Sequence, residues 1–265
     1  MDRITLVNIL NIVNSGDYFI DGFSMSDKVI TIESEVNSCI DLLINNLANI
    51  SELNIVVNEG SQFILSLLTD EEMFKHKIKI TVKKNGVLNG YFADFSKAIN
   101  DFNCQIDLAG EYANCVFKVA SLASRSDIKK IDISLVHNHS KTIGRIDCFG
   151  VCKDEAKLTF SGVSHIIKGA IKSKTQQNAK VVVFDKASDA VAKPNLKIDE
   201  NDIEASHAAV VGKINDEHLF YLTSRGLSEA DAKELITLGY LKPILIGFKE
   251  DDIKNRISSL IEGRM

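Results

Sequence analysis

Short apolar runs with strand spacing recur along the chain at a nearly constant interval. They begin near Ile78, Cys104, Ile131, Leu158 and Val181, at spacings of 26, 27, 27 and 23 residues. Apolar and polar residues alternate within the runs, so one face of each strand is expected to be buried and the other wet. A repeat of this size indicates a solenoid, in which each coil stacks on its neighbours because it cannot bury its apolar face alone.

The turns between the runs leave a second architecture open. Asn58-Glu59-Gly60 and Asn85-Gly86 are polar and supply residues that accept the positive φ of tight corners. An Asn-Gly pair also favours a hairpin, so the pattern alone fits an antiparallel sandwich as well as a parallel solenoid. The two prolines, Pro194 and Pro243, interrupt no expected central strand and fit either architecture.

Residues 1–25 differ from the strand region that follows over 26–213. Apolar residues with helical spacing occur there: Leu6, Ile9, Leu10 and Val13. A polar turn beginning at Asn14 ends the segment. We expect residues 1–25 to form a short N-terminal cap on a mainly β core.

Residues 214–265 have helical rather than strand spacing. Asn215 or Asp216 can cap a first helix, and Gly226 can terminate it. Ser228 opens a pattern that resembles the capping box of a second helix, and a third amphipathic segment follows. Because these segments carry apolar stripes, we expect them to cover the last coil or to bind a partner.

Charge and cysteine content exclude several classes of protein. A net charge of −5 leaves no basic excess to neutralise phosphates, so no nucleic-acid partner is expected. No apolar run approaches the ~20 residues that span a bilayer, and the first residues lack a signal-peptide pattern. The five cysteines, an odd number without regular spacing, favour reduced thiols. We therefore expect a cytoplasmic protein without a membrane partner.

Two pairs of residues could be metal ligands. Cys148 and Cys152 lie four apart on an expected strand, too far for a compact chelate unless Gly150 bends the strand. Buried thiols that act as small apolar side chains are the preferred interpretation, as for Cys104 and Cys115. His137 and His139 share a strand face without a third ligand nearby, and exposed corner residues are the preferred interpretation there.

The stretch from Pro194 to Gly226 joins the strand region to the helical region. It contains, in order, Pro194, Leu196, Asp202-Ile203-Glu204, Ser206-His207-Ala208-Ala209, Gly212, Leu219-Phe220-Tyr221-Leu222 and Ser224-Arg225-Gly226. In this series the stretch resembles the SufB/SufD family, the scaffold subunits of the SUF iron–sulfur cluster assembly system. Weaker matches lie upstream at His137, Lys141-Thr142 and Thr175-Gln176-Gln177-Asn178. Such an ordered series is far more specific than one short motif, and it is closer to SufD than to SufB.

The resemblance implies a right-handed parallel β-helix, which favours the solenoid over the sandwich. It also implies that His207 lies at the interface between two scaffold subunits, beside the place where a nascent cluster forms. A neutral imidazole can coordinate iron, whereas a histidine packed at the domain junction is the plain alternative. Many SufD members have cysteine where this chain has Ala205, and no cysteine follows Cys152. This chain alone is therefore not expected to hold a cluster tightly.

The family docks the SufC ATPase on its C-terminal helices, so Phe220, Tyr221 and Arg225 are candidate partner-binding residues. Their plain alternative is packing against the last coil. No Ser-His-Asp order, phosphate-binding glycine loop or dinucleotide motif is present, so no catalysis is expected.

The resemblance thus implies a non-catalytic scaffold that binds a SufC-type ATPase and a SufB-type subunit or a second copy of itself, with a transient iron–sulfur cluster shared between the subunits. A purely structural subunit without metal contact, and a self-pairing scaffold that works with SufC alone, stay open. The self-pairing scaffold would need thiols from Cys104, Cys115, Cys148 or Cys152. A solenoid enzyme acting on polysaccharide is a remote alternative, because no acidic cluster recurs at coil spacing.

Overall fold

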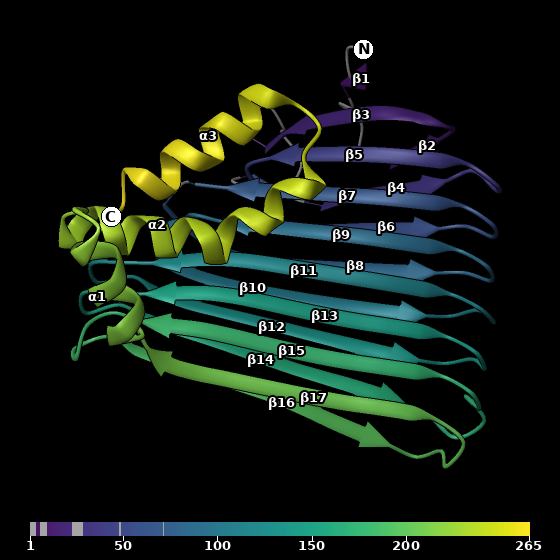
Figure 1. Cartoon of the computed structure of the whole chain (residues 1–265). Coiled ribbons are helices and arrows are strands. Elements are labelled where there is room, and N and C mark those ends of the chain that lie inside the picture. Colours follow the sequence, from purple (N-terminus) through teal and green to yellow (C-terminus); the bar gives the residue numbers. More distant parts are fainter. Residues whose placement is uncertain (1–3, 6–9, 23–28, 48, 71) are drawn as a thin grey trace.

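The computed structural model of the chain describes residues 4–5, 10–22, 29–47, 49–70 and 72–265. They form two stacked parallel sheets followed by a helical region (Figure 1). The nine-stranded sheet comprises β1 (Ile4–Thr5), β3 (Gly16–Asp21), β5 (Cys39–Asn45), β7 (Gln62–Thr69), β9 (Val87–Asp94), β11 (Asn114–Ala123), β13 (Ile143–Cys152), β15 (Lys174–Val183) and β17 (Glu204–Lys213).

The eight-stranded sheet comprises β2 (Leu10–Val13), β4 (Val29–Ser34), β6 (Glu52–Val57), β8 (Glu72–Val82), β10 (Lys97–Leu108), β12 (Ile128–His137), β14 (Lys157–Ile166) and β16 (Asp189–Ile198). The helices are α1 (Asp216–Ser224), α2 (Glu229–Leu241), the 3-10 helix η2 (Lys242–Gly247) and α3 (Asp251–Glu262).

Each strand pairs with the strand two places along the chain, and every described pair is parallel, as in β10 with β12 or β15 with β17. One coil therefore contributes one strand to each sheet. Asn85 has φ 55° and Gly60 φ 69°, as expected for tight corners. Both corners connect strands of different sheets, β6 to β7 and β8 to β9, so neither closes a hairpin. The expectation of a parallel β-helix with a C-terminal helical region is confirmed, and the sandwich alternative is wrong.

Alternating side chains fill the space between the two sheets. In β12, Ile131, Ile133 and Leu135 are buried, while the residues between them are partly exposed. Phe92 and Phe102 come from facing sheets and stack with their ring centroids 4.0 Å apart. The interior is thus a packed core rather than a channel over these coils.

The N-terminal segment is strand, not helix, where the structure describes it. Residues 10–13 form β2, which pairs in parallel with β4. The helix expected from the spacing of Leu10 and Val13 is therefore wrong, because pairing with the next coil overrides a weak local preference. Leu6 and Ile9, and the expected boundary between residues 25 and 26, lie outside the described residues.

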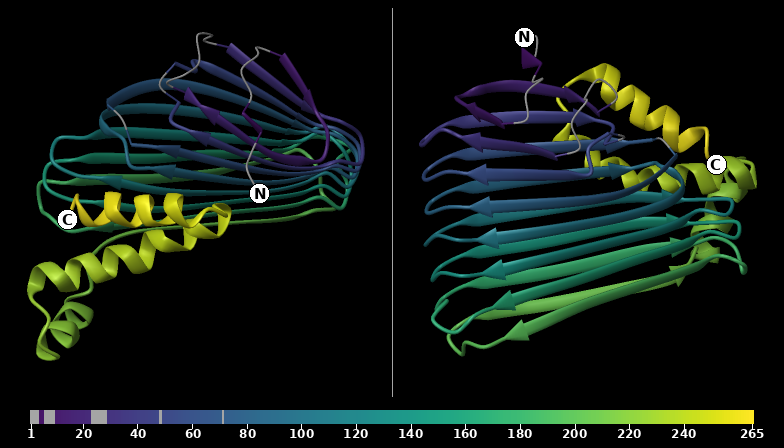
Figure 2. Two further views of the ribbon diagram at one scale, coloured as in Figure 1. Left: turned by 90° about the horizontal axis from the view of Figure 1, so that it is seen from above. Right: turned by 180° about the vertical axis from the view of Figure 1, so that it is seen from behind.

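Helices α2, η2 and α3 pack on the outer face of the nine-stranded sheet (Figure 2). This second core joins sheet residues to helical residues: Leu43, Leu68, Phe95, Leu122 and Val151 with Leu241, Ile244, Phe248, Ile257 and Ile261. Asn215 caps α1 and Ser228 caps α2, as expected from the sequence. Among the described residues, no helix is long and apolar enough to cross a bilayer.

Candidate functional site

The last coil leaves one end of the solenoid open. β16 and β17 are the final strands of their sheets, and each has a single strand neighbour. The free edge of such a strand presents backbone N–H and C=O groups that no ladder satisfies. Nearly every residue of β17 is exposed, whereas the inward residues of β15 are buried.

The His207 side chain lies on the inward side of β17, in register with core-facing residues of the preceding coils, which we call the inward row. It is exposed because no further coil covers it. In β17 it pairs in register with Gln177 of β15, which follows Ile146 of β13 and Phe117 of β11. These three predecessors are all buried. The imidazole of His207 therefore lies at the uncovered end of the core, which we call the mouth. A second protein surface could reach it there.

Several inward residues of the last coil are alanines. Ala190 and Ala192 of β16 are partly buried, and Ala205 and Ala209 of β17 are exposed. Their inward direction follows from their pairing with Leu158, Phe160 and the buried inward row of β15. Pro194 and Leu196 share the inward side of β16 and are partly buried, so the last coil fills its mouth only in part.

In the coil before the last, formed by β14 and β15, the core contains the polar side chain of Gln177. The Gln177 amide nitrogen donates to Ser164 Oγ at 2.6 Å and to the Asn195 carbonyl at 3.1 Å. Gly162 makes room for it, because a Cβ there would lie 2.7 Å from Gln177 Oε1. The buried role of Gln177 was not predicted from the sequence, although strand alternation places its amide in the buried phase, where an apolar residue is the norm.

A cavity of about 20 Å³ lies beside this polar group and is lined by Gln177, Cys148, Phe160 and their neighbours. That volume suits about one water molecule. Cys148 is the cysteine that contacts this space, and burial, followed by the charge of Asp147, raises its pKa to about 12. Its thiol is therefore protonated at neutral pH and is a poor metal ligand in this state, because the thiolate is the coordinating form.

The other interior cysteines behave as small apolar residues, as expected. Cys104, Cys115 and Cys152 are buried, and burial raises the pKa of Cys152 to about 11. Gly150 does not bend Cys148 toward Cys152, because β13 pairs continuously with both neighbours. A Cβ at Gly150 would instead lie 2.6 Å from the Leu158 side chain, so the glycine serves core packing.

His137 is buried, so the expectation of an exposed corner residue is wrong for it. It ends β12 on the inward face, where Nδ1 lies 2.7 Å from Thr142 Oγ1. Gly144 leaves space for the ring, because a Cβ there would lie 3.0 Å from Nε2. Burial lowers the pKa of His137 to about 4, which keeps the imidazole neutral. His139 lies beyond the strand and is exposed, as expected.

The structure does not bring His207 together with these groups. Within the described part of the chain, no group of three or more His, Cys, Asp or Glu side chains could hold a metal ion. Iron–sulfur clusters are held by several ligands, usually thiolates. The described residues therefore supply at most part of such a ligand set.

Helix α1 presents the candidate partner-binding residues. Phe220 is 74% exposed and Tyr221 55% exposed, so neither packs on the last coil. The Arg225 guanidinium lies 5.1 Å from the centroid of the Tyr221 ring and holds it in place by a cation–π contact. α1 has no buried residue, and an exposed aromatic helix is typical of a surface that a partner covers.

Comparison with known proteins identifies the family. A family model described as "SUF system FeS cluster assembly, SufBD core domain" matches residues 27–240. The iron–sulfur cluster assembly protein SufD of Bacillus subtilis is 34% identical over 49% of this chain and 30% of its own length. SufD of Escherichia coli is 27% identical over 63% of this chain and 40% of its length.

SufB of B. subtilis is also similar, at 29% identity over 51% of this chain and 29% of its own length. The chain thus spans less than half the length of these curated relatives. The matched core includes both the stacked coils and the open end with His207. The chain belongs to the SufB/SufD family of the SUF iron–sulfur cluster assembly system, on the SufD side of that family.

Proposed function

We propose that this chain is a non-catalytic, SufD-like scaffold subunit that pairs through its open end with a SufB/SufD-type subunit in the cytoplasm. The position of His207 carries the proposal: it lies in the inward row of the last coil and is nevertheless exposed. The free edges of β16 and β17 support it, because such edges pair readily with strands of another chain. The small residues at the mouth leave room for side chains of the partner.

At that interface His207 would supply or orient a ligand for iron or for a nascent cluster. The cluster is cargo that the two subunits share and neither holds permanently. A neutral imidazole suits iron, but one imidazole cannot hold a cluster. The partner must contribute the remaining ligands, since the buried thiols of this chain are protonated and Cys148 lies below the mouth.

Helix α1 would dock a SufC-type ATPase through Phe220 and Tyr221, with Arg225 at the rim. Laying a helix with exposed aromatic residues in a groove is a common recognition mode. Only residues 214–215 separate β17 from α1, so movement of the helix would reach the strand that carries His207. Association of two ATPase subunits on ATP binding would then twist the scaffold pair and open the interface.

A purely structural subunit, which stabilises its partners without touching metal, is the second candidate. The burial of Cys104, Cys115, Cys148 and Cys152 favours it, because these thiols do not reach the open end. The two candidates differ only in what His207 does.

The test uses co-expression of the full chain with a SufB-type and a SufC-type subunit. His207→Ala should leave the purified complex intact and lower its content of iron and acid-labile sulfide. His139→Ala, which changes an exposed histidine on a corner, should change neither. Unchanged cluster content with His207→Ala would select the purely structural subunit. Recovery of the chain with neither partner would refute the scaffold proposal itself, and recovery with only the ATPase would select a self-pairing scaffold.

A further inference from the structure

Three basic side chains between Lys249 and Arg264 bind different coils of the solenoid. The first, Lys249, lies just before α3. Its Nζ is 3.0 Å from Asp17 Oδ1 of β3 and 2.9 Å from Asp41 Oδ2 of β5. Asp17 and Asp41 stand directly opposite each other in the ladder. One ammonium group thus joins two adjacent coils.

Arg256, in the middle of α3, binds the next coils. One guanidinium nitrogen donates to Asn45 Oδ1 at 2.8 Å, and the other donates to Asp70 Oδ2 at 2.6 Å. Asn45 ends β5, and Asp70 directly follows β7. The Asn46 amide also donates to Asp70 at 3.1 Å, so the arginine closes a network that already links the two turns.

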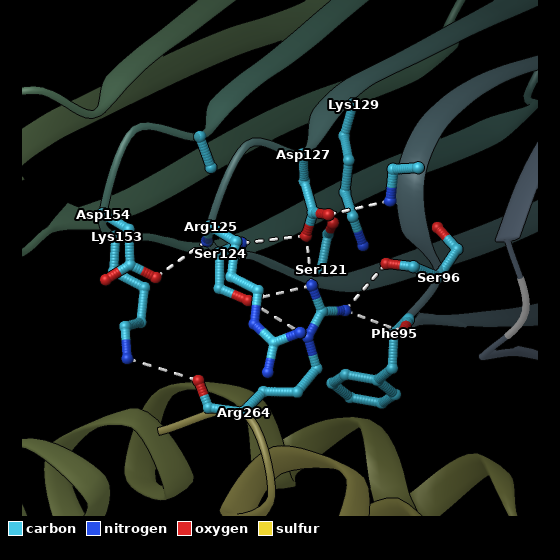
Figure 3. Close-up of polar contacts among 12 residues, drawn as sticks. Phe95, Ser96, Ser121, Ser124, Arg125, Asp127, Lys129, Lys153, Asp154 and Arg264 are labelled. Atoms are coloured by element: carbon cyan, nitrogen blue, oxygen red, sulfur yellow. Dashed lines mark hydrogen bonds and ion pairs between the residues drawn. The ribbon is translucent and has the colours of Figure 1, made fainter.

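Arg264 is the last of the three and the most buried (Figure 3). Its guanidinium donates to the Phe95 carbonyl at 2.8 Å and to the Ser96 carbonyl at 2.7 Å, both just after β9. It also donates to Ser124 Oγ at 2.9 Å and forms an ion pair with Asp127, both after β11. A planar fork with several fixed donors is suited to such a convergent set of acceptors.

Further hydrogen bonds hold the turn that Arg264 binds. Asp127 accepts hydrogen bonds from the backbone N–H of Ala98 and of Ser124. Lys153, after β13, donates to the Arg264 carbonyl at 3.3 Å. The side chains of Arg264 and Asp127 are only 9% and 6% exposed, so solvent screens this pair much less than an ordinary surface pair.

The three anchors follow the order of the coils. Lys249 binds β3 and β5, Arg256 binds the ends of β5 and β7, and Arg264 binds the turns after β9 and β11. α3 crosses the strands obliquely (Figure 1). Ile257 and Ile261, which lie between Arg256 and Arg264 in the sequence, are buried in the core that the helices form with the sheet. Within the described residues, none of these three cations bonds to β14, β15, β16 or β17.

We propose that residues 249–264 form a strap that locks the coils from β3 to β13 into one rigid body and leaves the open end outside it. The coupling of this strap to cluster assembly rests on the proposed function. Twisting by a bound ATPase would then be confined to α1 and to the last coils, where His207 lies, while the strapped coils keep their spacing.

Hydrogen exchange on the full chain, followed by mass spectrometry, tests the strap. Replacing both arginines (R256Q/R264Q) removes charge-assisted hydrogen bonds, so amide exchange should speed up about tenfold or more in α3 and in the turns after β7, β9 and β11. Exchange in β16 and β17 should not change. Arg225→Gln on α1 is the matched control and should leave α3 unaffected. If amide exchange in α3 is unchanged, or if it speeds up equally in β17, the strap proposal is wrong.

If R256Q/R264Q does not fold, Arg264→Lys keeps the charge and removes the fork. Faster exchange limited to the end of α3 and the turns after β9 and β11 supports the strap, and faster exchange in β17 or none in α3 refutes it. A second arm adds a SufC-type ATPase and a non-hydrolysable ATP analogue to the wild-type chain. Exchange should change in α1 and β17 and not in α3, and an equal change in α3 would refute the strap. Failure to bind the ATPase would refute the proposed docking instead, and the first arm would still decide on the strap.

Discussion

The coils in the middle of the solenoid and the coil at its open end share one backbone pattern and differ in what faces inward. The middle coils place Phe92, Phe102 and Phe117 in the core, and all three are fully buried. The last coil continues the parallel ladder but offers Ala205 and Ala209 to the same space. Parallel pairing therefore sets the architecture in both regions, while the inward side chains are large in the middle coils and partly replaced by alanines in the last coil.

The packing of neighbouring coils shows the same difference. Gly90 leaves room for Phe117, because a Cβ at Gly90 would lie 2.3 Å from the phenyl ring of the next coil. At the open end, His207 continues the row of Phe117, Ile146 and Gln177, and no further strand follows β17 in the sheet. The middle of the molecule is matched in shape from coil to coil, whereas the open end still has inward surface to bury.

The largest expected effect is in the filled coils. Phe117→Ala removes a buried aromatic ring and should lower the free energy of unfolding by about 3–5 kcal/mol. Ala209→Leu, which adds volume to the same sheet at the open end, should change it by about 0.5 kcal/mol or less because nothing there is overpacked. Urea denaturation of both variants measures the difference. Similar losses for the two would mean that the end coil is as closed as the middle.

A smaller effect depends on pH and separates a buried histidine from an exposed one. The pKa of His137 is about 4 in the folded chain, against about 6.5 for an unperturbed histidine. The unfolded chain therefore takes up the proton first, and stability falls as the pH drops from about 6.5 to about 4, by at most about 3 kcal/mol.

His137→Asn keeps a polar group near Thr142 and should remove this part of the acid sensitivity. His139→Asn is the control and should retain it, since that side chain is exposed. The measurement is the difference in unfolding free energy between pH 7 and pH 4.5 for each variant. An acid sensitivity that His137→Asn leaves intact would contradict burial of the neutral ring.

The smallest effect compares ion pairs in the two regions. Lys249→Met removes a half-exposed cation that joins two coils and should cost about 0.5–1 kcal/mol. Lys174→Met removes the partner of Glu204 at the open end, where both side chains are more than half exposed, and should cost about 0.3 kcal/mol or less. Thermal denaturation at low and high salt checks both values. A larger loss of stability for Lys174→Met than for Lys249→Met would contradict the prediction that the open end has the weaker ion pairs.

The local features of the fold were predictable from the sequence, and the contacts between distant residues were not. Alternation identified the buried residues of β12, and capping chemistry identified Asn215 and Ser228, because both depend on neighbours a few residues away. The same local logic failed for Leu10–Val13, where pairing with β4 outweighed helical spacing. It also assigned His137 to the surface, whereas the ring lies in the core, where Gly144 of the facing sheet leaves space for it.

His207 entered as a candidate through family resemblance, and its position at the open mouth follows from register with Gln177. By itself, the sequence determined the strand repeat, the change from strands to helices and the family, since these depend on residue types and short spacings. The strand pattern alone left parallel pairing open, and the resemblance favoured it. Only the tertiary structure decided the register of the coils, the open last coil and the binding of Arg264 near Asp127. These features depend on contacts between residues that the stacking of whole coils brings together, and no local pattern encodes them.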